Sequence, residues 1–502
     1  MKRRTFVTST LAVAASASFP LGRLLAADGQ PLAVLSDINA VKLDGSETTI
    51  EKAVLKELAN SLTGHILLPN SEGYDSARKG WNGMIDKHPA LIVQCMNKSD
   101  ITHAVNLARE YELLTAVRGG GHNIAGKGTC EGGIQISCTP MQGVSVDADA
   151  RTATVEPGVL IGAVDAATQV YGLATPAGVV SHTGAAGLTL GGGFGKLSRT
   201  LGLTSDNVNY FDIVTADGDF KRVTAKSDPD LFWALRGGGG NFGVVTAFNY
   251  QLHQVGTEFL SGAAMHPIKN AKEVLSFYAE LIATAPNELQ ASCTTLVFPT
   301  GKGFVNISAF YAGDPAEGEK VIGPLKNFGK PMRTDFKVQK YIDIQKTTDR
   351  NVPVGQQYYQ KAGLMKAVDP GLIEAIVEIT QNPKPFTETM NFTQIGGMIN
   401  ELPMDASAYP NRDAEAQIVV GGGWPKPVEE AGEWVDLIRK DWKTVVPYTN
   451  GFYVNNSIGE EDDKRDRIRS NYGDNYDRLV EVKNEYDPTN LFRLNSNIKP
   501  TA

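Results

Sequence analysis

Residues 118–123 read Arg-Gly-Gly-Gly-His-Asn, and this stretch decides how the rest of the chain is interpreted. Residues 115–117, Thr-Ala-Val, come directly before it and are typical of a short β-strand. Successive glycines let neighbouring backbone N–H groups point the same way and form an anion-binding concavity. A diphosphate is a natural guest there, and His122 is either a functional residue or a hydrogen-bonded structural histidine.

Two further glycine-rich stretches follow. Residues 181–195 read Ser-His-Thr-Gly-Ala-Ala-Gly-Leu-Thr-Leu-Gly-Gly-Gly-Phe-Gly, and residues 236–243 read Arg-Gly-Gly-Gly-Gly-Asn-Phe-Gly. The second contains the spacing of a dinucleotide fingerprint, but it follows a predicted helix and precedes a predicted strand, the reverse of that motif. The glycines serve either tight turns in a β-rich fold or close approach of the backbone to a ligand, and their clustering favours the ligand.

Periodicity predicts short alternating strands and helices from about residue 90 to 250, and a separate α+β organisation in 259–450. Ser99 is predicted to cap a helix, Asp217-Gly218 to turn a hairpin over 211–224, and 467–486 to form one charged helix. Further predicted helices are 231–235, 271–285 and 428–445, and further predicted strands are 244–252, 304–311 and 415–420.

Composition bounds the class of protein. The chain has 502 residues, 42% of them hydrophobic, and a net charge of -8, so it can build a large core and is not generally basic. We therefore expect no nucleic-acid partner. The four cysteines are too few for a disulfide framework and contain no C-x-x-C pair, so we expect no metal centre. Cys130 and Cys138 either pair or, as we favour, stay as buried thiols.

Residues 1–27 are predicted to be an export signal. Arg3 and Arg4 precede an apolar run from Leu11 to Phe19, and Ala26-Ala27 offers a cleavage site. The paired arginines followed by x-Phe resemble a twin-arginine signal, which predicts a periplasmic or secreted protein. The alternative is an uncleaved anchor, but the run is short for a membrane span. We expect no stable membrane insertion once the signal is removed.

The glycine stretches, in this order, resemble the vanillyl-alcohol-oxidase/PCMH superfamily of flavoproteins. Residues 475–480, Asn-Tyr-Asp-Arg-Leu-Val, and 486–498, Tyr-Asp-Pro-Thr-Asn-Leu-Phe-Arg-Leu-Asn-Ser-Asn-Ile, are similar to the C-terminal signature of its berberine-bridge-enzyme-like branch. The resemblance implies an α+β fold: a PCMH-type FAD-binding domain of two α/β subdomains, and a substrate domain with an antiparallel sheet. It places the FAD domain at 28–258, the substrate domain at 259–450, and a segment that completes the FAD site at 451–502.

The resemblance also implies which residues bind FAD. His122 matches the histidine that bonds to the flavin 8α-methyl group, Val244 matches a backbone contact to the adenine end, and Asn455 and Asn497 match C-terminal residues that return to the flavin ring. The remaining matches line the diphosphate and the isoalloxazine: Arg118, Gly119, Gly120, Gly121, Asn123, Ile124, His182, Thr183, Gly184, Gly187, Leu188, Thr189, Leu190 and Gly191.

This sequence departs from the family at three positions. Val180 stands where many relatives carry a second, flavin-bonded cysteine, so we expect one covalent link. Asn456 replaces the tyrosine that ends a Tyr-x-Asn-Tyr motif beginning here at Tyr453. Gln417 stands where relatives often place a carboxylate base, and an amide cannot accept the proton. Glu415, two residues earlier, is predicted to share the strand face of Gln417; it is either the base or a solvated carboxylate.

The resulting hypothesis is an FAD-linked oxidase. We expect it to pass a hydride from a small alcohol, sugar, amine or phenolic to covalently bound FAD and then to oxygen, giving hydrogen peroxide. Two alternatives stay open: a dehydrogenase that uses another electron acceptor, and a flavin-binding protein without catalysis. Glu415, Gln417 and Tyr453 are the candidate catalytic residues.

Overall fold

A computed structural model of the chain describes residues 36–459 and 464–501. The predicted export signal lies outside the described residues. The first glycine stretch belongs to a four-stranded sheet in the order β3 (His65–Leu67), β4 (Leu91–Gln94), β6 (Ile134–Ser137) and β5 (Thr115–Arg118). β4 and β5 both run parallel to β6. Their carboxyl ends therefore share one edge, and residue 119 starts there.

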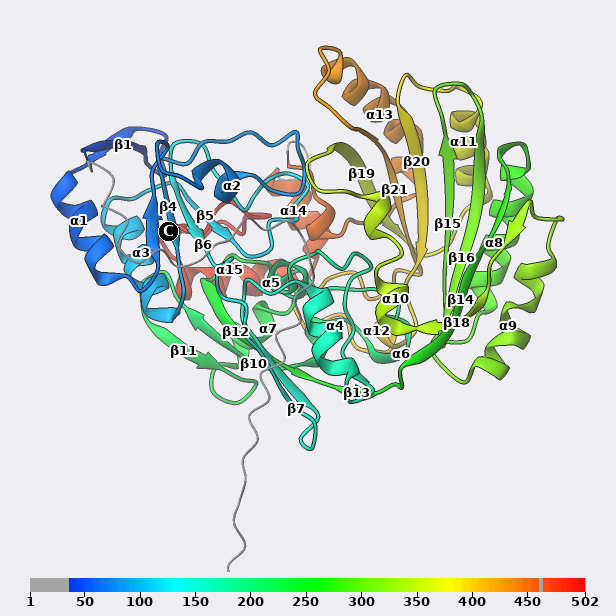
Figure 1. Cartoon of the computed structure of the whole chain (residues 1–502), viewed down its shortest axis with the longest axis horizontal. Helices are drawn as coiled ribbons and strands as arrows, with labels where there is room; N and C mark the ends of the chain where they lie inside the picture. The colour runs from blue at the N-terminus through cyan, green and yellow to red at the C-terminus, as the bar shows by residue number, and fades with distance from the viewer. Residues whose placement is uncertain (1–35, 460–463, 502) are drawn as a thin grey trace, which may run out of the picture. The chain divides into compact units, whose positions relative to one another are not determined.

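Helices α1 (Lys52–Ser61) and α3 (Lys98–Glu110) pack beside this sheet (Figure 1). Helix α3 begins earlier than predicted, because Asn97 rather than Ser99 is the N-cap and its side chain accepts from the Asp100 N–H. Three short elements complete the subdomain: β1 (Ile38–Val41), β2 (Glu47–Ile50) and α2 (Tyr74–Arg78).

A second sheet is antiparallel, and the third glycine stretch leads directly into one of its strands, β12 (Val244–Gln251). The order of this sheet is β11 (Phe220–Val223), β10 (Val208–Val214), β12, β8 (Thr152–Val155) and β7 (Val144–Asp147). The predicted hairpin is present, with Gly218 at φ +87° in its turn. The other elements are α4 (Ile161–Gln169), β9 (Leu173–Ala174), α5 (Ala185–Leu190), α6 (Ser198–Leu201), α7 (Pro229–Ala234) and β13 (His253–Gln254).

The following part of the chain builds one large antiparallel sheet (Figure 1). Its order is β17 (Arg333–Thr334), β14 (Glu258–Pro267), β16 (Gly303–Tyr311), β15 (Leu289–Val297), β20 (Thr387–Gln394), β21 (Ala416–Trp424) and β19 (Gln357–Met365), with β18 (Lys337–Lys340) also paired to β14. Helices α8 (Ala271–Thr284), α9 (Pro315–Asn327), α11 (Pro370–Thr380) and α13 (Ala431–Val445) cover one face. We call this the helix-covered face and the other the front face.

The C-terminal part is not the single helix predicted over 467–486. Gly473, at φ +51°, separates α14 (Arg465–Tyr472) from α15 (Asn475–Tyr486). Two short helices, α10 (Tyr341–Gln345) and α12 (Met398–Glu401), complete the α-helices that Figure 1 labels. All four cysteines are buried free thiols, so Cys130 and Cys138 do not pair.

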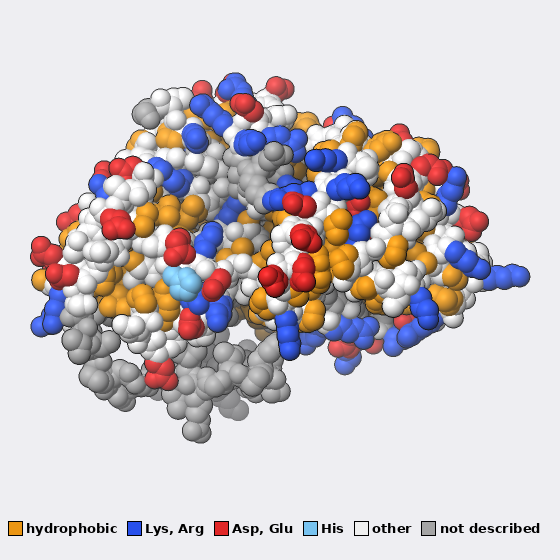
Figure 2. Space-filling view, turned by 90° about the horizontal axis from the view of Figure 1, so that it is seen from above, with side chains coloured by type: hydrophobic (Ala, Val, Ile, Leu, Met, Phe, Trp, Pro, Cys, Tyr) orange, Lys and Arg blue, Asp and Glu red, His pale blue; other side chains and the backbone are white. Residues whose placement is uncertain are grey.

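Two features of the structure concern possible partners, namely the hydrophobicity of its helices and the charge on its surface. Among the described residues, no helix is both long and apolar enough to cross a membrane. Figure 2 shows lysine and arginine side chains interspersed with aspartate and glutamate over the face in view.

Candidate active site

The first two glycine stretches touch each other directly. A Cβ atom on Gly120 would lie 2.4 Å from the Gly184 Cα, and one on Gly184 would lie 2.5 Å from the Gly120 nitrogen. Any side chain at either position would force the two loops apart. This close approach brings together their histidines, whose ring centroids, His122 to His182, are 5.0 Å apart.

His122 ends a column of stacked aromatic rings. The Trp81 ring lies 4.5 Å from the His122 ring with 9° between their planes, and the Tyr358 ring lies 4.2 Å beyond Trp81 at 11°. Trp81 comes from the loop after α2 and Tyr358 from β19 of the large sheet. The imidazole is therefore oriented by residues from two distant parts of the chain.

Asn82 fixes this column through its backbone neighbours. Its Nδ2 donates to the carbonyls of Ile124, at 2.8 Å, and Tyr358, at 3.0 Å. Its Oδ1 accepts from the Tyr358 N–H at 3.0 Å. In addition, the backbone N–H of Trp81 donates to the Gly121 carbonyl at 2.9 Å. Residues 81 and 82 thus connect the first glycine loop to β19 by hydrogen bonds.

Burial keeps both histidines neutral. It lowers the pKa of His122 to about 3, with the neighbouring His182 adding to the effect. Burial also lowers the pKa of His182, against the opposing pull of the Asp349 carboxylate. Asp349 itself accepts hydrogen bonds from the Ser181 N–H, at 2.8 Å, and hydroxyl. An imidazole that stays neutral has a free lone pair and can act as a nucleophile.

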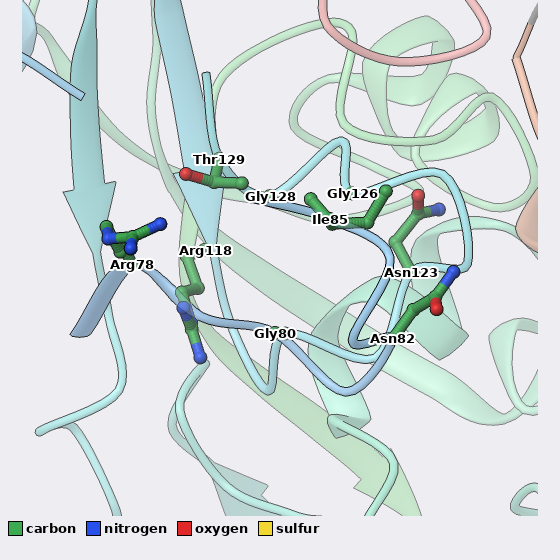
Figure 3. A pocket seen from close by; sticks show the side chains of 10 residues that line it. Arg78, Gly80, Asn82, Ile85, Arg118, Asn123, Gly126, Gly128 and Thr129 are labelled. Atoms are coloured by element: carbon green, nitrogen blue, oxygen red, sulfur yellow. The ribbon is translucent and has the colours of Figure 1, made fainter. Parts of the chain in front are cut away.

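A small pocket lies beside the first glycine loop (Figure 3). Asn82 and Asn123 lie at one end, and Arg78 and Arg118 at the other. Arg118 donates to the carbonyls of Ala77 and Lys79, and its Nε has no partner among the described residues. Its burial lowers its pKa to about 10, which leaves it charged at neutral pH. The lining residues are Arg78, Gly80, Asn82, Ile85, Arg118, Gly121, Asn123, Gly126, Gly128 and Thr129.

The second glycine stretch meets the C-terminal part of the chain. Asn455 Nδ2 donates to the Leu188 carbonyl at 3.1 Å and to the Tyr453 hydroxyl at 2.7 Å. A Cβ on Gly191 would lie 2.3 Å from Asn455 Oδ1, so the glycine permits this approach. At Gly187 a Cβ would meet nothing within 4 Å. The loop is thus closed at residue 191 and open at residue 187.

Tyr453 and Gln417 both lie near this junction. The buried Tyr453 hydroxyl accepts from the Gly193 N–H at 3.1 Å as well as from Asn455. Burial raises its pKa above the usual range, so the phenol keeps its proton. Gln417 is 4% exposed, and its Oε1 accepts from Asn456 at 3.2 Å. Its Nε2 has no partner in the described part of the chain and remains able to donate.

Glu415 lies one residue before the start of β21, and its backbone still pairs with both neighbouring strands: its N–H donates to the Met365 carbonyl at 2.9 Å, and its carbonyl accepts from the Ile395 N–H at 2.8 Å. Its Oε1 accepts from Asn400 Nδ2 at 2.8 Å, and its charge acts on Arg199. The carboxylate therefore already interacts with two groups, Asn400 and Arg199, at the end of the sheet.

The third glycine stretch binds the chain's own tail. Asn495 Nδ2 donates to the Gly240 carbonyl at 3.0 Å, and Asn241 Nδ2 donates to the Ser496 carbonyl at 3.1 Å. Asn241 Oδ1 accepts from the Ile498 N–H at 3.2 Å. Val244 starts β12 directly after this loop and is buried. The loop follows helix α7 and precedes strand β12, which is the reverse of a Rossmann fingerprint, as the sequence predicted.

These residues fit a flavin cofactor. His122 Nε2, both ring nitrogens of His182 and Asn497 Oδ1 are buried without hydrogen-bond partners in the described residues. Such atoms are costly unless a further group meets them. The open backbone at Gly187 provides an approach free of side chains. No cluster of three or more metal-ligating side chains occurs within the described ranges.

Trp81, Asn82, Asp349 and Tyr358 were not found from the sequence. Trp81 and Asn82 contact the predicted cofactor residues His122 and Ile124, and Tyr358 in turn contacts Trp81 and Asn82. Their partners lie far along the chain: 276 positions separate Asn82 from Tyr358. No local pattern marks a stacking aromatic ring, so only the folded chain reveals them.

Comparison with known proteins places these features in a family. An FAD binding domain model matches residues 89–224, and a model described as berberine and berberine like matches residues 448–499. An FAD-linked oxidoreductase of Dictyostelium discoideum is 34% identical over 454 residues, which cover 89% of this chain and 97% of that protein. The (R)-6-hydroxynicotine oxidase of Paenarthrobacter nicotinovorans is 27% identical over 451 residues, 88% of this chain and 97% of that protein.

The fold agrees with solved structures of the same kind. The structure of a chitooligosaccharide oxidase superposes with a TM-score of 0.80 at 20% identity, covering 89% of this chain and all of that one. The α+β architecture, with mixed and antiparallel FAD-side sheets and a large antiparallel sheet, is thereby shown. The chain belongs to the berberine-bridge-like family of FAD-linked oxidoreductases.

Proposed function

We propose that this enzyme is an oxidase that holds FAD through a single covalent bond to His122 and oxidises a small organic substrate. The substrates considered are alcohols, sugars, amines and phenolics. The observation that carries the proposal is the enclosed, neutral His122 imidazole with an unpartnered Nε2, at the contact of two glycine loops. The 6-hydroxynicotine oxidase among the relatives supports the oxidase over a dehydrogenase.

The chemistry that FAD would supply when bound is hydride transfer from the substrate and the passage of the electrons to oxygen, which gives hydrogen peroxide. The protein supplies position and electrostatics. The glycine loops let backbone approach the cofactor, His122 anchors it, and Asn455 and Tyr453 join the second loop to the C-terminal segment. The amide of Gln417 has a free donor for a substrate oxygen or nitrogen.

None of the three candidate catalytic side chains is a free base. Gln417 is an amide, and burial keeps Tyr453 protonated. The Glu415 carboxylate is engaged by Asn400 and acts on Arg199. These contacts favour a substrate whose proton leaves with little help from a carboxylate.

Denaturing the purified protein and precipitating it tests the covalent bond. We expect yellow colour in the wild-type pellet and its release to the supernatant from His122→Ala. His88→Ala, which changes a half-exposed histidine elsewhere, is the matched control and should keep the colour in the pellet. Colour retained in the His122→Ala pellet would assign the bond to another residue.

Peroxide formation tests the oxidase. We expect one hydrogen peroxide per substrate oxidised in air. Flavin bleached by substrate under nitrogen, followed by slow or absent peroxide release in air, would identify a dehydrogenase instead. A flavin that no alcohol, sugar, amine or phenolic bleaches would identify a binding protein without catalysis.

We also propose export through the paired arginines near the N-terminus. The support is the sequence pattern alone, Arg3-Arg4 followed by the apolar run. Cell fractionation of the wild type and of an Arg3→Lys, Arg4→Lys double variant tests it. Wild-type protein that remains in the cytoplasm at full length would contradict export.

A further inference from the structure

One segment of the chain contacts both of the loops that support the buried histidine pair. It runs from residue 345, at the end of α10, to residue 358 in β19, and we call it the strap. The Gln345 side chain donates to the Gly178 carbonyl at 3.0 Å, shortly before the second glycine stretch. Farther along the strap, the Gly355 N–H donates to the Trp81 carbonyl at 2.8 Å. The strap therefore holds together the segments on which the two histidines depend.

Asp349 lies in the strap between these contacts and is fastened to the second glycine stretch. One of its carboxylate oxygens accepts from the Ser181 N–H at 2.8 Å, and the other accepts from the Ser181 hydroxyl. Ser181 directly precedes His182 in the chain. The carboxylate is half-buried, so water screens its charge only in part. Two hydrogen bonds thus fix a negative charge beside the histidine pair.

The charge of Asp349 reaches both imidazoles. Burial has the largest effect on the pKa of His122 and of His182 and lowers both values. The Asp349 carboxylate opposes burial at each ring and raises both pKa values, because a negative charge favours a positively charged imidazole. Asp349 is therefore placed to stabilise positive charge on either histidine.

A bond to the flavin requires His122 to carry such a charge for a time. A neutral imidazole attacks with its lone pair, so the ring is positive until its remaining N–H proton leaves. Burial disfavours that charge at His122. A fixed negative charge lowers the energy of the charged ring, and a neutral base beside it takes the proton.

His182 is available as that base. Its ring centroid lies 5.0 Å from that of His122, with 32° between the two planes. Both of its nitrogens are buried without a hydrogen-bond partner among the described residues. Burial lowers its pKa and so keeps the ring neutral. One nitrogen of a neutral imidazole has a free lone pair and can accept a proton.

We propose that Asp349 and His182 promote the attachment of FAD to His122: Asp349 stabilises the positive charge on the attacking imidazole, and His182 removes its proton. The inference rests on the proposed function, because it concerns how the proposed covalent bond forms. Asp349 acts through the two histidines and is a positioning residue.

The attachment balances with oxygen as the oxidant. The flavin 8α-methyl group loses one C–H proton, His122 loses its N–H proton, and a C–N bond forms between the two groups. The two electrons of the broken C–H bond pass to the isoalloxazine ring and then to oxygen. Oxygen takes these electrons with the two protons and becomes hydrogen peroxide, which leaves the attached flavin oxidised.

The rate of covalent attachment tests the inference. The full-length protein is produced under riboflavin limitation, FAD is added in air, and samples quenched with acid are compared for flavin absorbance in the pellet and the supernatant. Asp349→Asn keeps groups that can bond to Ser181 but removes the charge, and it should slow attachment by about ten- to hundredfold. His182→Phe keeps a ring without nitrogen and should slow attachment by about hundredfold or more.

Three comparisons separate the charge from a structural role. Asp165→Asn removes another buried carboxylate, which accepts from Gln345 of the strap at 3.1 Å and acts on Lys196, and it should leave the rate unchanged. Asp349→Glu restores the charge and should recover part of the rate. FAD affinity, measured without attachment in the His122→Ala background, should change by less than about threefold when Asp349→Asn is added.

The outcomes distinguish this inference from the proposed function. Attachment at the wild-type rate in Asp349→Asn or in His182→Phe would overturn the inference, and a yellow wild-type pellet would then leave the covalent bond itself in place. A loss of FAD affinity as large as the loss of attachment rate would also overturn it, because Asp349 would then serve binding alone. A wild-type pellet that stays colourless would overturn the proposed bond and the inference together.

Discussion

At the scale of single residues, Trp81 controls how the His122 imidazole is held. The two rings are stacked at 4.5 Å, and the Trp81 Nε1 donates to the Val352 carbonyl at 2.9 Å. We predict that Trp81→Ala lowers the fraction of covalently bound flavin while FAD still binds, because a loosened imidazole spends less time in the reactive orientation. The ratio of flavin absorbance in the denatured pellet to that in the supernatant measures it.

Trp81→Phe keeps a flat ring in the stack and should retain most of the covalent fraction. Trp434→Ala changes a partly buried tryptophan on α13 and serves as the control. A Trp81→Ala enzyme with the wild-type covalent fraction would show that the stack does not position His122.

Val180 provides a second prediction at this scale. It stands where relatives carry a cysteine, and its carbonyl accepts from the Thr183 N–H at 3.0 Å in the turn that leads to the second glycine loop. We predict that Val180→Cys gives a second flavin bond. The decisive measurement uses the double variant Val180→Cys, His122→Ala, whose denatured pellet should regain the colour that His122→Ala loses. A colourless double variant would mean that residue 180 does not reach the flavin.

At the scale of elements, helix α15 docks the tail through a buried ion pair. Lys483 Nζ lies 2.6 Å from Asp487 Oδ2 and donates to the Asn241 carbonyl at 2.7 Å, and both side chains are fully buried. Asp487 also accepts from the N–H groups of Leu491 and Phe492, at 2.8 and 2.9 Å. One ion pair thus joins α15, the third glycine loop and the tail.

We predict that Lys483→Met destabilises the enzyme by about 3–5 kcal/mol, because Asp487 is left buried without its counter-charge. Urea unfolding followed by fluorescence measures the change. Lys499→Met, which removes an exposed charge from the tail itself, should change the free energy of unfolding by less than about 0.5 kcal/mol. Equal effects of the two substitutions would mean that the buried pair adds nothing specific.

At the scale of the whole molecule, the sequence predicted what local composition determines. Glycine clusters predicted the loops that approach each other at Gly120 and Gly184, since a missing side chain is visible in the sequence itself. The alternation in β20, Thr-Glu-Thr-Met-Asn-Phe-Thr-Gln, gives the strand one buried and one half-buried face in the same local way, although no strand was predicted there from the sequence.

Contacts between distant segments could not be predicted in this way. Trp81 and Tyr358 stack although one lies in a loop and the other in β19, far apart in the sequence. The ion pair of Arg412 with Asp206 joins positions 206 residues apart. Nothing in a neighbouring sequence pattern selects one partner among so many. Glu415 shows the same limit on a small scale, because where a strand begins depends on the strands that pair with it.

The stability of the whole molecule should depend on pH because a carboxyl group is buried in the core. Glu388 is a fully buried residue of β20, and it lies near Asp441 of α13, whose Oδ2 is 2.9 Å from Lys384 Nζ. Burial is the main cause that raises the pKa of Glu388 to about 8, and the nearby Asp441 is the second. The folded protein therefore keeps this proton at pH values where the unfolded chain, with its pKa near the model value of 4.5, has lost it.

A pKa raised on folding stabilises the folded state fully below the unfolded pKa and loses that contribution as pH rises toward the folded one. Glu388 should thus make the free energy of unfolding fall between about pH 4.5 and 8, by up to about 1.4 kcal/mol per pH unit. Urea unfolding at pH 5, 6, 7 and 8 measures this slope. Glu388→Gln, which is neutral throughout, should flatten it, whereas Glu378→Gln on the exposed side of α11 should not. An unchanged slope in Glu388→Gln would show that Glu388 is ionised in the folded protein.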